Sequence, residues 1–169
     1  LHLNDRGTSD DVIFNLNPKW PLKWLYVTGQ EVSDRGVAAL FPYRETVLDV
    51  SHSRVTDESV RLLKPFPLLR GLLLENTAIT DAAIPILAEF PALVSLDVSN
   101  TKVTGDGLAY LADCPDLTKL QVKNVPLSDD DLVKLAKLKL VELNVRGAGV
   151  SVNAVQRFRG THPECRVTD

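Results

Sequence analysis

The sequence predicts an α/β solenoid, a stack of short repeats with a parallel β-sheet on one side and short helices on the other. Three observations predict this fold class. A serine or threonine, often followed by aspartate, recurs every 23 or 24 residues along the chain. Leucine and a second apolar residue precede it with the alternation of a β-strand. Two further apolar residues follow it at helical spacing.

The recurring hydroxyl residue serves as the marker from which each repeat is counted. The markers are Ser33, Thr56, Thr80, Thr104, Ser128 and Ser151. Aspartate follows four of them directly, but not Thr104 or Ser151. An additional partial copy at the start has Ser9 as its marker, with Leu1 and Leu3 in the strand positions.

Five apolar columns run through the six complete repeats without exception. The column eight residues before the marker contains Leu25, Leu48, Leu72, Leu96, Leu120 and Leu143. The column six residues before it contains Val27, Val50, Leu74, Val98, Val122 and Val145. The other three columns lie one residue before the marker and four and seven residues after it. Chance does not produce such agreement, so we predict that these side chains form one continuous core.

Each column predicts a local structure. The two leucine and valine columns predict a strand that is buried on one side. The marker hydroxyl is a preferred helix N-cap, and an aspartate just inside the helix favours the positive end of its dipole. The two later columns lie one helical turn apart, so both face the core. Pro67, Pro91 and Pro115 are expected to end their helices.

These patterns predict a single domain over residues 1–169. We expect a truncated first repeat over 1–21, main repeats of 23–24 residues over 22–150, and a last helix with a C-terminal cap over 151–169. The chain has no methionine and opens in the middle of the pattern. We therefore expect it to be a piece of a longer protein.

The stretch Leu96-Asp97-Val98-Ser99-Asn100-Thr101-Lys102-Val103-Thr104 resembles the leucine-rich repeat family, whose pattern is L-x-x-L-x-L-x-x-N/C-x-L. The short repeat length and the helical second half resemble the bacterial and the cysteine-containing, F-box-type members. This resemblance implies a right-handed solenoid, a horseshoe with a concave strand face. It also implies protein recognition on that face and no further activity.

The resemblance also implies a ladder of asparagine side chains that hydrogen-bond the backbone of neighbouring turns. Asn76, Asn100 and Asn124 stand at the family's asparagine position, and His52 replaces it in the second full repeat. We predict that His52 takes over the role of the asparagine. Gly29 and Gly147 stand at this position in the two end repeats.

Composition excludes several partner classes. A net charge of −3 is too small and of the wrong sign to favour nucleic acid. No apolar run approaches the roughly 20 residues that a membrane span needs. Residues 1–117 carry 10 basic and 16 acidic side chains, whereas residues 118–169 carry 9 basic and 6 acidic ones.

Cys114 and Cys165 fit no disulfide framework or metal motif, so we expect two buried thiols.

Alternate strand positions point away from the core, so the side chains of the concave face follow from the repeat. The candidate partner-binding residues are Trp24, Tyr26, Asp49, Leu73, Glu75, Asp97, Lys119, Gln121, Lys123, Asn144 and Arg146. They run from aromatic through acidic to basic along the chain. Trp24 and Tyr26 beside Leu73 have the composition of a binding hot spot. An equally weighted interpretation is that Trp24 and Tyr26 cover the N-terminal segment, which contains Trp20.

The sequence predicts no catalytic, cofactor or metal site. His52 lies close to Asp49, Ser51 and Ser53, which resembles a Ser/His/Asp set. Strand alternation places Asp49 and Ser51 on the sheet face and turns His52 into the ladder, so we expect no triad. No phosphate loop, nucleophile elbow or HExxH motif is present.

The leading functional hypothesis is a protein interaction module that binds its partner through the concave face and is itself not an enzyme. We expect the chain to be monomeric. A second hypothesis makes it the recognition half of a larger adaptor or enzyme, for example an F-box-like one. A third makes it a carbohydrate or small-ligand binder that uses Trp24 and Tyr26 as a stacking platform.

Overall fold

A computed structural model describes residues 1–3, 8–17, 19, 23–40, 47–66 and 68–169. Eight strands form one parallel sheet in which the spatial order is the order along the chain. The strands are β1 (His2–Leu3), β2 (Trp24–Val27), β3 (Val47–Asp49), β4 (Gly71–Leu73), β5 (Ser95–Asp97), β6 (Lys119–Gln121), β7 (Glu142–Asn144) and β8 (Arg166–Thr168). This is the predicted α/β solenoid.

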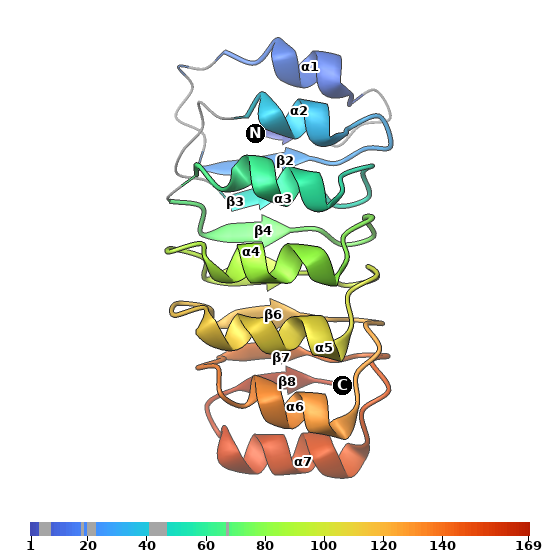
Figure 1. The fold of residues 1–169 in the computed structure, drawn as a ribbon, viewed down its shortest axis with the longest axis vertical. Coiled ribbons are helices and arrows are strands. Elements are labelled where there is room, and N and C mark those ends of the chain that lie inside the picture. The colour runs from blue at the N-terminus through green and yellow to red at the C-terminus, as the bar shows by residue number, and fades with distance from the viewer. Residues whose placement is uncertain (4–7, 18, 20–22, 41–46, 67) are drawn as a thin grey trace.

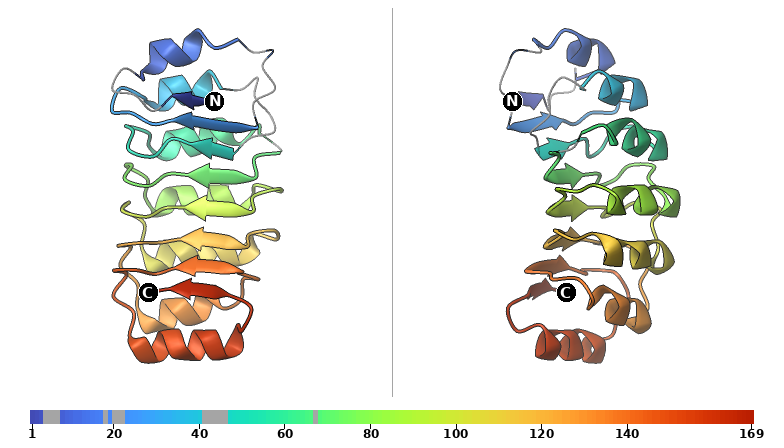
Figure 2. Two further views of the ribbon diagram at one scale, coloured as in Figure 1. Left: turned by 180° about the vertical axis from the view of Figure 1, so that it is seen from behind. Right: turned by 60° about the vertical axis from the view of Figure 1, so that its left-hand side comes forward.

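Short helices connect successive strands and cover one side of the sheet, which leaves the other side open (Figures 1 and 2). The α-helices are α1 (Asp10–Phe14), α2 (Asp34–Ala38), α3 (Asp57–Leu63), α4 (Ile84–Ala88), α5 (Gly105–Leu108), α6 (Asp129–Leu135) and α7 (Val152–Thr161). Two 3₁₀ helices, η1 (Asp81–Ala83) and η2 (Ala109–Asp113), adjoin α4 and α5. In these two repeats the helical segment is divided between a 3₁₀ helix and an α-helix.

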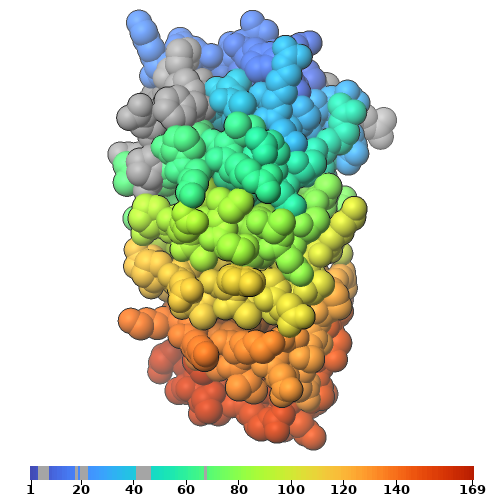
Figure 3. Space-filling model, viewed as in Figure 1, coloured from blue at the N-terminus to red at the C-terminus, as the bar shows by residue number. Residues whose placement is uncertain are grey.

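The five predicted columns form the core between the sheet and the helices. All their members are buried except Val150, which is partly buried. The repeats follow one another as successive bands along the long axis (Figure 3). No helix among the described residues is long and apolar enough to cross a membrane.

The return segments add core columns that the repeat pattern had not predicted. Ten residues after the marker, the buried side chains are Phe66, Phe90, Cys114 and Leu138. Thirteen residues after it, they are Leu69, Leu93 and Leu117. Cys114 thus occupies a core position of the repeat, and both cysteines are buried free thiols. Pro67, one of the expected helix ends, lies outside the described residues.

Every marker is the N-cap of its helix, as predicted, and most marker hydroxyls accept a backbone N–H of the first turn. The aspartate after the marker has a role that the sequence analysis did not foresee. The carboxylate of Asp34 accepts hydrogen bonds from the backbone nitrogen of Thr56 at 2.8 Å and from its hydroxyl at 2.7 Å. Each such pair joins one repeat to the next.

The same double hydrogen bond recurs along the solenoid, so we call it the aspartate ladder. Its further pairs are Asp10 with Ser33, Asp57 with Thr80, Asp81 with Thr104, and Asp129 with Ser151. The marker hydroxyl thereby donates to the preceding repeat, and in each of these pairs except that of Thr104 it also accepts a backbone N–H of its own helix.

One junction departs from the ladder. Gly105 stands where all the other repeats except the last carry aspartate, and Asp131 of the following repeat fills the space. Asp131 accepts the backbone nitrogen of Ser128 at 3.0 Å and its hydroxyl at 2.7 Å, and the two residues form a capping box. Burial by itself raises the pKa of Asp131, but hydrogen bonds from Lys134 and Ser128 outweigh it and lower the pKa to about 2.

The two ends of the chain complete the sheet. β1 pairs with β2, and Ile13 of the partial first repeat lies in the core. The tail, for which the sequence predicted only a cap, contains the eighth strand. In β8, Arg166 pairs in register with Glu142 and Thr168 with Asn144.

Candidate functional site

The open side of the sheet, here called the strand face, carries two rows of outward side chains. The register aligns Trp24, Val47, Gly71, Ser95, Lys119, Glu142 and Arg166 in the first row. It aligns His2, Tyr26, Asp49, Leu73, Asp97, Gln121, Asn144 and Thr168 in the second. Neighbours within a row lie about 4.8 Å apart, because each belongs to the next strand.

Aromatic rings gather at the N-terminal end of this face. The rings of His2 and Tyr26 stack with centroids 4.1 Å apart, and the ring of Trp24 lies 6.5 Å from that of Tyr26. Trp24 leaves 55% of its surface exposed. Tyr26 therefore does cover part of the first strand, whereas Trp24 remains an exposed platform. Trp20 lies outside the described residues.

The middle of the face is acidic, but its carboxylates differ in exposure. Asp49 is partly exposed, and its Oδ1 accepts the backbone nitrogen of Ser51 at 2.9 Å. Asp97 makes the same bond with Ser99, also at 2.9 Å. Only 9% of Asp97 is exposed, so the expectation of an open surface position is wrong for it. The reason is crowding, since residues of adjacent strands flank it on both sides.

Burial raises the pKa of Asp97, and this effect outweighs the hydrogen bonds from Ser99. The nearby charge of Glu75 raises the pKa further, while that of Lys123 lowers it. The carboxylate at the centre of the face is thus the most strongly desolvated charge of the strand face.

The basic C-terminal half is largely neutralised within the face. Lys123 contacts Glu75 at 2.9 Å across two strands, and Lys119 contacts Glu142 at 3.4 Å. Arg166, which the sequence analysis had not placed on this face, also pairs with Glu142. The predicted gradient from acidic to basic therefore exists in sequence order, but ion pairs cancel much of it in space.

The remaining candidates lie at the C-terminal edge of the face. Gln121 and Asn144 line a shallow polar hollow of about 270 Å³ together with Glu142, Arg166 and Thr168. Asn144 also accepts the backbone nitrogen of Arg146 at 3.1 Å, and the Arg146 side chain is exposed.

The ladder residues lie in the turns that follow the strands. His52, Asn76, Asn100 and Asn124 all have left-handed backbone conformation, with φ between 54° and 58°. Asparagine tolerates this conformation better than most residues, and histidine also adopts it. The hydrogen bonds of this column join side chains, where the sequence predicted bonds to the backbone. Asn124 donates to Asn100 at 2.7 Å, and Nδ1 of His52 lies 3.1 Å from Nδ2 of Asn76.

The Ser/His/Asp combination is not assembled. His52 is bound to Asn76, Asp49 to the backbone of Ser51, and the hydroxyl of Ser53 donates to the carbonyl of Val50. Within the described ranges, no three histidine, cysteine or acidic side chains converge as a metal site would require.

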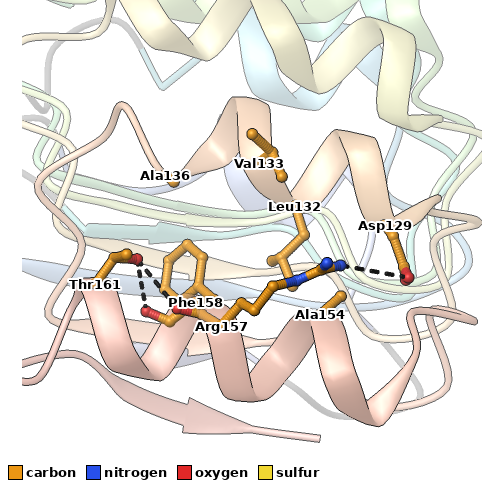
Figure 4. Close-up of a pocket in the computed structure, with 8 residues that line it drawn as sticks. All are labelled: Asp129, Leu132, Val133, Ala136, Ala154, Arg157, Phe158 and Thr161. Atoms are coloured by element: carbon orange, nitrogen blue, oxygen red, sulfur yellow. Dashed lines mark hydrogen bonds and ion pairs between the residues drawn. The ribbon is translucent and has the colours of Figure 1, made fainter.

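An apolar groove lies on the helix side, between α6 and α7 (Figure 4). Its volume is about 180 Å³. Leu132, Val133, Ala136, Ala154 and Phe158 provide its apolar walls. At one end Arg157 lies 3.9 Å from Asp129, and at the other Thr161 hydrogen-bonds carbonyls of its own helix.

Comparison with known proteins agrees with this architecture. A family model described as leucine-rich repeat matches residues 91–112, which include the strand Ser95–Asp97 and its turn. No curated protein sequence matches the chain.

Three solved structures illustrate the likeness in fold. A chain of the Rad7 and Elc1 complex in yeast is 21% identical over 94% of this chain and 44% of that one, with a TM-score of 0.67. An internalin of Listeria monocytogenes is 17% identical over 93% of this chain and 49% of its own, with a TM-score of 0.62. A leucine-rich repeat protein of Leptospira interrogans is 16% identical over 87% of this chain and 48% of its own, with a TM-score of 0.56.

The chain spans about half the length of these solved chains. The marker repeat, the single parallel sheet and the matching family model agree. The chain has the leucine-rich repeat fold, and one stretch of it matches the leucine-rich repeat family model.

Proposed function

We propose that this chain is a protein interaction module that binds its partner through the strand face and performs no chemistry of its own. The observation that carries the proposal is the open sheet. Helices cover one side of it (Figure 2), while the strand register aligns two rows of side chains on the other. A rigid sheet with aromatic, aliphatic and charged side chains at fixed spacing has the composition of a protein interface.

Three features support a macromolecular partner. Trp24 is exposed beside Tyr26, as expected of an anchor residue. Leu73 is partly exposed between two carboxylates. The two rows extend over all eight strands, which is more surface than a small ligand contacts. The fold likeness to a chain of the Rad7 and Elc1 complex adds an example of this architecture within a protein assembly.

The test is affinity capture from a lysate of the source cells, with identification by mass spectrometry. The parent is compared with a strand-face variant that combines Tyr26→Ala, Leu73→Asp and Lys119→Glu. A matched control makes the same kinds of change on the helix side, at the exposed residues Tyr110→Ala, Val133→Asp and Lys137→Glu.

We expect the parent and the helix-side control to retain a partner that the strand-face variant loses. If only the helix-side control lost the partner, the interface would lie on the helices instead. Capture by none of the three would favour a small ligand at Trp24, which Trp24→Ala alone tests. The alternative of a recognition half within a larger adaptor is tested by sequencing the gene beyond both ends of this chain.

A further inference from the structure

The charges of the strand face divide into paired and unpaired ones. Glu75 and Glu142 contact lysine or arginine side chains of other strands. Asp49 and Asp97 form no ion pair with any residue that the structure describes. Each accepts a backbone N–H through Oδ1, from Ser51 and Ser99 respectively, and Asp97 also accepts a hydrogen bond from the side chain of Ser99.

Lys123 does not supply the missing cation. Its charge acts on Asp97, but its Nζ is bound to Oε1 of Glu75 at 2.9 Å. Asn100 donates to the same oxygen of Glu75 at 3.0 Å. Asp97 therefore bears the cost of desolvation without a direct basic partner. A cation arriving from outside would find it already dehydrated and would stabilise its ionised form.

The two free carboxylates stand at a defined spacing beside apolar surface. In the second row, Asp49 and Asp97 flank Leu73, and Tyr26 lies on the other side of Asp49. Two strand spacings separate the carboxylates, which is about 9.6 Å. Tyr26 and Trp24 provide aromatic faces next to this acidic stretch.

We propose that this half of the strand face, formed by Trp24, Tyr26, Asp49, Leu73 and Asp97, binds an arginine- or lysine-bearing segment of the protein partner. The proposal deepens the function proposed above and rests on it. The long basic side chain lies with its aliphatic part on Leu73 and an aromatic ring, and its cation meets Asp49 or Asp97. Arginine fits best, because its planar guanidinium both stacks on aromatic rings and donates to carboxylates.

The opposite half of the face does not offer the complementary site for an acidic segment. Its lysines and Arg166 are engaged by Glu75 and Glu142. Among the described residues of this half, Arg146 alone has no ion pair, so an acidic partner would meet one unpaired cation, whereas a basic partner finds both Asp49 and Asp97 unpaired.

The experiment measures binding of labelled peptides to the full chain by fluorescence anisotropy. A polyproline II peptide places residues i and i+3 on one side about 9.3 Å apart, close to the spacing of the two carboxylates. The probes are proline-rich peptides with two arginines spaced two, three or four positions apart. Each is paired with a version in which citrulline, and one in which glutamate, replaces both arginines.

The variants are Asp49→Asn and Asp97→Asn, which keep the Oδ1 acceptor of each turn. Asp130→Asn on α6 is the matched control, because it removes one exposed carboxylate away from the face. Lys119→Gln reports on the other half of the face. We expect arginine peptides to bind, citrulline and glutamate peptides not to bind, and each strand-face aspartate variant to weaken binding about tenfold. Asp130→Asn should leave binding unchanged, and Lys119→Gln shows whether the other half of the face contributes to binding.

Binding that survives Asp49→Asn and Asp97→Asn, preference for the glutamate peptides, or no binding by any arginine peptide would overturn the inference. The proposed function is judged separately. If the inference is overturned, a captured protein that is lost in the strand-face variant would still support the strand face as the interface. Capture insensitive to every strand-face change would overturn both.

Discussion

Asp57 and Thr80 lie 23 residues apart and are joined by two hydrogen bonds. The backbone nitrogen of Thr80 donates to Oδ1 of Asp57 at 2.8 Å, and its hydroxyl donates to Oδ2 at 2.6 Å. The same hydroxyl accepts the backbone nitrogen of Ala82 at 3.2 Å. One carboxylate thus orients the N-cap residue of the next helix. The contact that stacks two repeats therefore also helps the second repeat to form its helix.

Asp57→Ala should lower the free energy of unfolding by about 2 kcal/mol, because it leaves the partly buried N–H and hydroxyl of Thr80 without their charged acceptor. Urea denaturation followed by circular dichroism measures the change. Asp130→Ala, at an exposed first-turn position of α6, is the control and should change stability by less than about 0.5 kcal/mol. Equal effects of the two variants would mean that the aspartate acts only on the helix dipole.

Leu96→Ala should cost about 2–5 kcal/mol, since Leu96 is fully buried in the central strand and its truncation leaves a cavity. Leu68→Ala is the matched control, because 45% of Leu68 is exposed. Chemical denaturation of both variants compares them directly. A Leu96→Ala variant as stable as the parent would contradict the assignment of this column to the core.

Comparing Asn100→Ala with Asn100→Gly separates two contributions of this ladder residue, its side-chain hydrogen bond and its left-handed backbone conformation. Both remove the hydrogen bond with Asn124, but only alanine is strained at a φ of 56°. We expect Asn100→Ala to be less stable than Asn100→Gly by about 1 kcal/mol, as measured by urea denaturation. If glycine were the less stable of the two, loss of the side chain rather than backbone strain would dominate.

The decrease in the free energy of unfolding at acidic pH should depend on Asp131. Its folded-state pKa of about 2 lies below the unfolded value near 3.9. The contribution of its carboxylate is therefore complete above about pH 4 and is lost as the pH falls toward 2. Denaturation midpoints at pH 6, 4, 3 and 2 should fall less steeply for Asp131→Asn than for the parent. Parallel curves would show that Asp131 is not responsible.

The carboxylate of Asp97 should affect the pH dependence of stability in the opposite direction to that of Asp131. Because burial raises its folded-state pKa, ionisation destabilises the fold at neutral pH, and this cost disappears as the pH falls through that pKa. Asp97→Asn should therefore unfold at a higher denaturant concentration than the parent at pH 7, and the difference should close near pH 3. A variant less stable than the parent at pH 7 would show that the charge itself stabilises the sheet. Retaining a residue that costs stability is expected at a binding site.

Repetition made most of the fold predictable. A periodic column such as Leu72, Leu96 and Leu120 must lie in equivalent places, so one sequence period determined strands, markers and core together. The left-handed backbone of the ladder positions was not predicted, although asparagine is favoured in this conformation. The return column with Phe66 and Cys114 was missed because its residue type changes from phenylalanine to cysteine and then to leucine along the chain.

The sequence by itself thus determined the solenoid, its repeat boundaries and the side chains that face outward. Tertiary structure alone decided which outward charges are free. Glu75 meets Lys123 across two strands, 48 residues away, and Arg166 joins the face only through the eighth strand. Asp97 becomes buried only through its neighbours on the adjacent strands. The physical reason is that a repeat pattern specifies the direction of a side chain, whereas burial and pairing depend on which different side chains the stacking of strands brings beside it.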